Sequence, residues 1–102
     1  MQSEKQNLRV VIFPLSNGYV ASCLDLCLVA EEKTQEEAAR GITELINANI
    51  SLVKGEVPTK KFRFPPATFL LFEQGKIYDY TPRLPQQVKR RYGGIEFRAY
   101  SG

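Results

Sequence analysis

The chain of 102 residues contains no histidine. Histidine is the side chain that most often acts as a general base, and it usually activates serine or cysteine nucleophiles. Its absence excludes triad hydrolysis, and we assign no catalytic residue. With only two cysteines present, one chain also lacks the four sulfur and nitrogen ligands of a structural zinc site. We therefore expect no metal, no cofactor and no enzymatic activity.

The only cysteines are Cys23 and Cys27. We interpret both as buried strand residues that behave as small apolar side chains. The alternatives are a disulfide and a metal ion shared across a dimer, and both are less favoured for an intracellular protein.

Acidic residues are too few and too scattered to indicate a two-metal nuclease. Such chemistry needs carboxylates that converge on bound cations, and Asp25 and Asp79 are the only aspartates. Four glutamates cluster between residues 31 and 37, but Glu36 and Glu37 fall in the first turn of a predicted helix, where negative charge stabilises the helix dipole. The pair Gly93-Gly94 lacks the surrounding spacing of a phosphate-binding loop.

Long apolar runs are also missing. The longest, residues 10–13 and 69–72, are far shorter than the roughly 20 residues of a membrane span. The N-terminus lacks the pattern of a secretory signal, so we expect a cytoplasmic protein with no membrane association. The length fits a single domain, residues 1–102.

The first third of the chain predicts a three-stranded antiparallel meander. Residues 8–13 are rich in β-branched and aromatic side chains and are followed by Pro14, which we expect to end the first strand. Residues 16–18 form a turn into a second strand at 19–23, and a third strand follows at 26–31. Their nearly continuous apolar character indicates that at least one strand is covered on both faces or lies at a dimer contact.

A long helix follows, because Thr34-Gln35-Glu36-Glu37 has the S/T-x-x-E form of a capping box. Gly55 is placed just after its end. Gly41 lies inside it and is interpreted as a packing position rather than a hinge. A stripe with helical spacing is expected to pack on the sheet, and it consists of Ala38, Ile42, Leu45, Ile46, Asn49 and Val53.

The second half is less regular. Residues 57–66 form a proline-rich linker, and residues 66–74 fit either a helix or a strand. Residues 85–92 predict a short helix, and the alternation in residues 94–100 predicts a strand that joins the meander as its fourth member. The expected fold is α+β, an antiparallel sheet of three to four strands with one long helix on one face.

Charge is divided unevenly between the two halves. Residues 1–53 carry 4 basic and 7 acidic side chains, whereas residues 54–102 carry 10 basic and 4 acidic ones, a net +6. Cations beside a tyrosine suit a nucleic-acid or acidic-protein contact, and a solvated cationic surface is the alternative. The candidate contact residues are Lys60, Lys61, Arg63, Lys89, Arg90, Arg91 and Tyr92.

Residues 8–53 resemble the HicB-like antitoxin family. The likeness is carried by Gly18-Tyr19, Leu24-Asp25-Leu26, Thr34, Glu36-Glu37-Ala38 and the stripe of Ile42, Leu45 and Ile46. It implies a partial ribonuclease H fold and a non-catalytic, dimeric module that binds and masks a small toxin. The chain departs from the family in two ways. The family linker contains prolines and a glycine, which are absent from Leu24-Asp25-Leu26-Cys27, and no DNA-binding motif follows residue 54. Both suit an orphan HicB-like domain, with nucleic-acid binding through the basic C-terminal half as the alternative.

Overall fold

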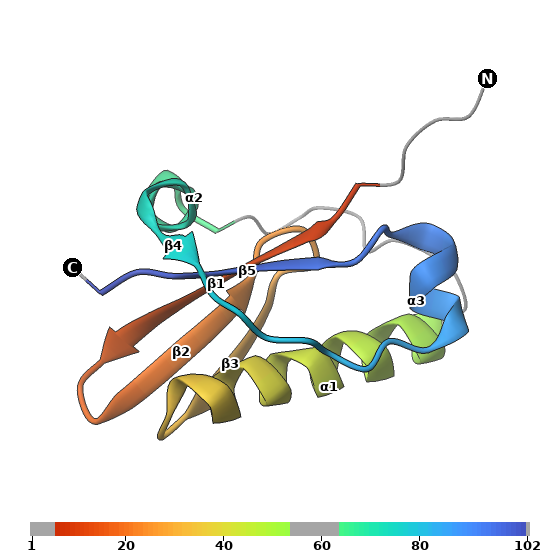
Figure 1. The fold of residues 1–102 in the computed structure, drawn as a ribbon, viewed down its shortest axis with the longest axis horizontal. Coiled ribbons are helices and arrows are strands. Elements are labelled where there is room, and N and C mark those ends of the chain that lie inside the picture. The colour runs from red at the N-terminus through yellow and green to blue at the C-terminus, as the bar shows by residue number, and fades with distance from the viewer. Residues whose placement is uncertain (1–5, 54–63, 102) are drawn as a thin grey trace.

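The described part of the chain forms one mixed β-sheet with helices on both faces (Figure 1). The computed structural model describes residues 6–53 and 64–101, and for residues 51–53 and 87 it describes the backbone alone. The strand order is β3-β2-β1-β5-β4. The strands are β1 (Leu8–Leu15), β2 (Gly18–Cys23), β3 (Leu28–Glu32), β4 (Lys76–Ile77) and β5 (Ile95–Ala99). The helices are α1 (Gln35–Val53), α2 (Pro66–Gln74) and α3 (Gln86–Arg91). The α+β class expected from the sequence is confirmed.

β1 and β2 form the expected antiparallel hairpin, which closes with Leu15 opposite Gly18. In the loop between them Ser16 has a φ of 49°, the positive value that tight hairpin turns require. Gly18 is needed for a different reason. A Cβ there would lie 2.5 Å from the carbonyl oxygen of Glu32, so the end of β3 can approach β2 only because the side chain is missing.

β1 does not end before Pro14, as the sequence suggested, but continues to Leu15. The N–H of Tyr100 donates to the carbonyl of Ile12, so Ile12 turns its backbone groups toward β5. Pro14 turns the same way two residues later, past the last β1–β5 pair, Ile12 with Ala99. Its missing N–H therefore removes no ladder hydrogen bond.

The third strand begins later than expected, at Leu28 instead of residue 26. Residues 24–27 form a turn, and Cys27 has a φ of 57° at its end. Leu24 and Leu26 are buried although they lie in this turn. Their apolar character reflects packing beneath the turn, which the sequence pattern could not separate from strand character.

α1 begins at the predicted capping box. The Glu37 N–H donates to the Thr34 Oγ1 at 3.1 Å, and the Thr34 hydroxyl donates to the Glu37 Oε1 at 3.2 Å. These contacts satisfy one of the free N–H groups of the first turn and hold an acidic side chain at the positive end of the helix.

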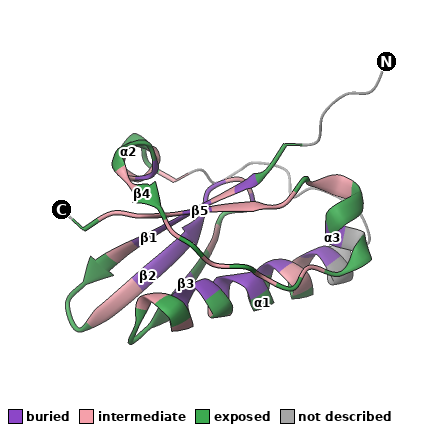
Figure 2. Cartoon of the chain, in the orientation of Figure 1, coloured by how far each residue is buried: buried purple, intermediate pink, exposed green. Residues whose placement is uncertain are grey.

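The buried face of α1 differs from the predicted stripe at Leu45, which is 40% exposed. Ile42 and Ile46 are fully buried, and Leu45 is rotated by about 100° from Ile46 around the helix axis. Asn49 is half-buried, and the side chain of Val53 lies outside the description. The buried face comprises Ala38, Ala39, Ile42, Thr43, Ile46 and Ile50 (Figure 2).

The C-terminal segment pairs within the same sheet, as predicted, but β5 runs parallel to β1, with Val10 opposite Phe97. The expected antiparallel pairing is therefore wrong for this strand. A parallel neighbour requires a long crossover, and here the chain between β1 and β5 contains β2, β3, α1, α2, β4 and α3. The two-residue strand β4 pairs antiparallel with β5 and was not predicted.

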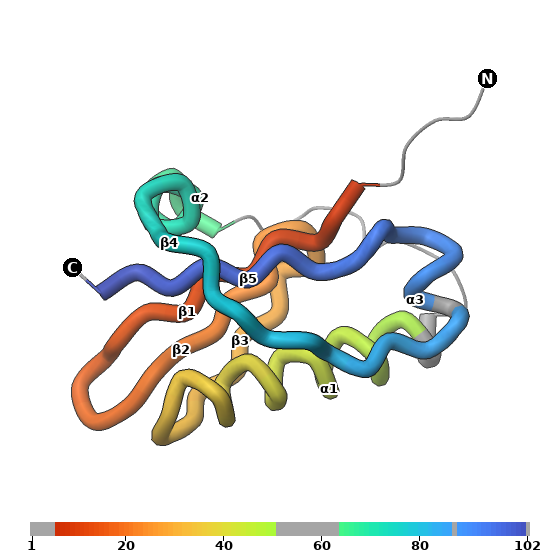
Figure 3. Tube along the Cα trace, in the orientation of Figure 1, coloured from red at the N-terminus to blue at the C-terminus, as the bar shows by residue number. Residues whose placement is uncertain are grey.

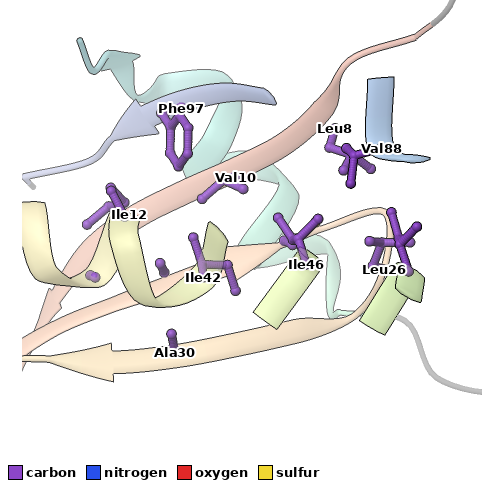
Figure 4. Close-up of a cluster of buried hydrophobic side chains, with 14 residues drawn as sticks. Leu8, Val10, Ile12, Leu26, Ala30, Ile42, Ile46, Val88 and Phe97 are labelled. Atoms are coloured by element: carbon purple, nitrogen blue, oxygen red, sulfur yellow. The ribbon is translucent and has the colours of Figure 1, made fainter. Parts of the chain in front are cut away.

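Helices cover both faces of β1. Val10 and Ile12 belong to the main core beneath α1, whereas Val11 packs with Phe72 of α2 on the opposite face. This coverage confirms that one strand is buried on both sides, and it settles residues 66–74 as a helix. Figure 4 shows the main core, with Phe97 of β5 close to the β1 residues and side chains of α1 pointing at the sheet.

The chain from β4 to α3 runs across the sheet beside α1 (Figure 3). Tyr78, Tyr80 and Leu84 of this segment pack against the main core, and the Tyr80 ring meets the Phe97 ring edge-on at 5.2 Å between centroids. The Asn47 side chain donates to the Arg83 carbonyl at 3.3 Å and joins the segment to α1.

Candidate functional site

The cationic end of α3 is the part of the predicted contact surface that the structure describes. Pro85 precedes the helix, and Lys89, Arg90 and Arg91 occupy its last turn, where positive charge is favourable to the helix dipole. Lys89 and Arg90 are exposed, whereas Arg91 is half-buried. Val88, on the opposite side of the helix, is fully buried and anchors α3 to the core. The remaining predicted cations, Lys60, Lys61 and Arg63, lie outside the described residues.

Tyr92 occupies a different environment from the one its sequence position suggested. Its ring is half-buried and packs against the main core. Burial raises the pKa of its hydroxyl, while the adjacent Arg91 lowers it. A ring held in the core offers only part of its surface to a stacking base, so the cations of α3 are better placed than Tyr92 to contact a partner.

α2 presents an apolar groove that sequence reasoning did not identify. The open groove has a volume of about 750 Å³, and its walls come from Phe64, Pro66, Phe69 and Leu70, with Glu73 as its charged member. Leu70 is 50% exposed. A helix that is apolar on every side is normally buried on every side. The sequence signal was present in the run Phe69 to Phe72, but it did not show which side the sheet would cover.

Two arginines from the sheet hold α2 against its second face. The guanidinium of Arg9 lies 5.6 Å from the centre of the Phe69 ring, and that of Arg98 lies 4.4 Å from the centre of the Phe72 ring. Arg98 also donates to the carbonyl oxygens of Phe72 and Glu73 at 3.2 and 3.4 Å, so it caps the C-terminal end of the helix. The orientation of the groove therefore depends on contacts of α2 with Arg9 of β1 and Arg98 of β5.

A second groove, of about 510 Å³, lies at the β1–β2 hairpin. Its lining mixes apolar residues such as Leu15 with the charged side chains of Glu31, Glu32 and Lys33. The groove borders the end of β3, where its two glutamates lie, and Lys33 directly follows that strand.

The cysteines are not linked by a disulfide, and only one of them matches the sequence interpretation. Cys23 is buried in β2, where desolvation raises the pKa of its thiol to about 12. Cys27 is exposed and lies in the turn before β3, so its predicted burial in a strand is wrong. Within the described ranges, no three acidic or cysteine side chains approach closely enough to hold a metal ion. In the same residues no helix is both long and apolar enough to cross a bilayer.

Comparison of the chain with protein-family models, with curated proteins and with solved structures gives no match.

Proposed function

We propose that this chain is a non-catalytic protein-interaction module that binds a small protein partner in the apolar groove of α2. The single observation that carries the proposal is the exposure of Leu70 beside Phe69 in that groove. Exposed aromatic and aliphatic side chains gathered in a concave surface provide the anchor sites typical of protein interfaces.

The groove also indicates the chemistry of the partner. Its floor and walls accept an apolar side chain, and Glu73 at one end favours a lysine or arginine next to that anchor. The groove stands on a helix that Arg9 and Arg98 hold in place, so it needs little rearrangement on binding.

The resemblance of residues 8–53 to HicB-like antitoxins adds three expectations to this proposal. The module forms a homodimer, its partner is a small toxin-like protein, and it acts in the cytoplasm without a membrane or a cofactor. The support for these expectations is the set of matched residues, from Gly18-Tyr19 to the α1 stripe, together with an α1 that packs over β2 and β3.

The proposal is tested by titrating the purified chain with the purified product of the gene encoded beside its own. We expect binding of the unmodified chain in isothermal titration calorimetry. Leu70→Arg should weaken binding by about tenfold or more, because a charge would enter an apolar anchor site. Leu15→Arg is the matched control, since Leu15 is equally exposed at 53% but lies on the hairpin.

Two results would contradict the proposal. If the unmodified chain gives neither heat nor a complex in the titration, the proposed small protein partner is excluded. Equal weakening by Leu70→Arg and Leu15→Arg would show that the α2 groove is not the binding site.

A second candidate function is nucleic-acid binding, favoured by the exposed Lys89 and Arg90 in the last turn of α3. Counterion release makes such binding weaken steeply with salt. Replacing Lys89, Arg90 and Arg91 with alanine should lower affinity for DNA or RNA and flatten the plot of log affinity against log salt. No binding of the unmodified chain at low salt would exclude this function.

A further inference from the structure

The outer edge of β3 is the unpaired border of the sheet on that side within the described residues. The ladder shows which residues face outward. The Leu24 N–H donates to the Arg9 carbonyl, so even-numbered residues at this end of β2 bond to β1 and odd-numbered ones bond to β3. By the β2–β3 register, Ala30 is then bonded inward, whereas Val29 and Glu31 direct their N–H and C=O groups away from the sheet.

Apolar side chains flank this edge on both faces of the sheet. A Cβ on Gly41 would lie 3.5 Å from the Ala30 Cβ, so this side of α1 lies over β3. Leu45, one turn further along the same side, is 40% exposed, and Ala48 beyond it is also exposed. Val29, on the opposite face, is 45% exposed. Exposed apolar groups beside an unpaired edge are a combination that monomeric sheets generally avoid.

The charges of β3 select one self-pairing register. When two copies of β3 pair antiparallel about Ala30, Glu31 of each copy lies opposite Val29 of the other, and no like charges are opposed. A shift of two residues in one direction places Glu31 opposite Glu31, which is repulsive. A shift in the other direction places Glu31 opposite Cys27, whose φ of 57° is outside the strand range. In the register centred on Ala30, the edge can therefore pair with a second copy of itself without opposing like charges.

The same pairing brings the two α1 helices together. Neighbouring strands lie about 4.8 Å apart, and α1 lies over β3 and β2. The axes of the two helices would then be separated by roughly 10 Å, the usual spacing of packed helices. Gly41, Leu45 and Ala48 would meet between them, and the short side chains of Gly41 and Ala48 permit close approach.

We propose that a second copy of this chain adds its β3 to this edge, which forms a ten-stranded sheet with α1 packed against α1 across the two-fold axis. The inference deepens the homodimer included in the proposed function and rests on it. It assigns the dimer contact to Val29, Glu31, Gly41, Leu45 and Ala48, a surface separate from the α2 groove.

The experiment measures the oligomeric state of the full chain by sedimentation velocity over a concentration series. Val29→Pro removes an N–H that faces away from the sheet, so it preserves the pairing within the chain and blocks the added strand. Leu45→Arg places a charge between the helices. We expect the unmodified chain to be dimeric and each variant to dissociate at concentrations about tenfold or more higher than the unmodified chain requires. Leu70→Arg is the control at a similarly exposed position on α2, and it should remain dimeric.

Each remaining result overturns the inference in a distinguishable way. A monomeric unmodified chain would overturn the homodimer and this interface together. A dimer that persists in both Val29→Pro and Leu45→Arg, or that dissociates in Leu70→Arg, would overturn the β3 edge alone. Circular dichroism verifies folding, and Leu45→Arg keeps the test decisive if proline unfolds the strand, because Leu45 lies on an exposed flank of α1.

Discussion

The carboxylate of Asp25 is held by Arg9 in three hydrogen bonds. The Arg9 N–H and Nε donate to Oδ2 at 2.8 and 3.4 Å, and Nη2 donates to Oδ1 at 2.7 Å. The pair fastens the β2–β3 turn to β1, and Arg9 reaches from there over the Phe69 ring of α2. Asp25 raises the pKa of the Arg9 guanidinium, chiefly through the side-chain hydrogen bond. One arginine thus connects the turn, the central strand and the helix that carries the apolar groove.

We predict that Asp25→Asn lowers the free energy of unfolding by about 1–2 kcal/mol, because charge-assisted hydrogen bonds are lost at a partly exposed site. Arg9→Lys should have a similar or smaller effect, since it keeps the charge but loses the fork. Urea unfolding measures both. Asp79→Asn, at the exposed second aspartate, should change stability by less than about 0.5 kcal/mol, and an equal loss in the two asparagine variants would refute the role of the pair.

Burial of Cys23 predicts a loss of stability at high pH. The folded-state pKa of about 12 exceeds the ordinary value of 9.0, so the folded chain retains a proton that the unfolded chain releases. The free energy of unfolding that depends on this proton is therefore fully present below pH 9.0, and it is lost as pH rises toward 12. Urea midpoints should fall over this window, and fall less in Cys23→Ala. If the urea midpoint of Cys23→Ala falls with pH as steeply as that of the unmodified chain, the loss of stability comes from the tyrosines instead. Tyr78 and Tyr92 also have raised pKa values.

The two cysteines should also differ in reactivity. At pH 8 a thiol reagent should modify the exposed Cys27 rapidly and Cys23 only as the chain unfolds, because burial shields the Cys23 thiol and raises its pKa. Counting modified thiols with time, with and without denaturant, measures this difference. Equal rates for both thiols in the native chain would contradict the burial of Cys23.

Two glycines should respond in opposite directions to alanine. A Cβ on Gly41 fits at 3.5 Å from the Ala30 Cβ, so Gly41→Ala should raise the free energy of unfolding by about 0.5–1 kcal/mol through helix propensity. A Cβ on Gly18 would collide with the Glu32 carbonyl, and Gly18→Ala should lower stability by about 1–3 kcal/mol. The free energies of unfolding are compared at equal protein concentrations. A lower free energy of unfolding in Gly41→Ala would show that the space beside Gly41 is more crowded than the structure indicates.

Removal of residues 94–102 should abolish cooperative folding. The deletion removes β5, an interior strand between β1 and β4, and the buried Phe97 with it. β1 would then lose its partner on one side and become an unpaired edge strand. Apolar side chains that β5 had covered would also be exposed, and both changes favour aggregation. Urea unfolding and light scattering test this, with a chain shortened only by residues 101–102 as the control. If the longer deletion leaves the urea midpoint unchanged, β5 does not contribute to the stability of the fold.

Local features were predictable because their physics acts within a few residues. The capping box from Thr34 to Glu37 needs only its own spacing, and α1 begins there as expected. The β1–β2 hairpin and α3 also follow from neighbouring turn and cap residues. The apolar groove of α2 was not foreseen, since an all-round apolar helix does not reveal which side the sheet will cover.

The sequence by itself determined the α+β class, the hairpin and the start of α1, because hydrophobic spacing and capping residues act through contacts close along the chain. Only the tertiary structure decided that Arg9 meets Asp25, that β5 lies parallel to β1 and that Leu45 is exposed over β3. These outcomes depend on which distant segments share a face, and the side chains of Leu45 and Ile46 look equivalent until the sheet takes its place beneath one of them.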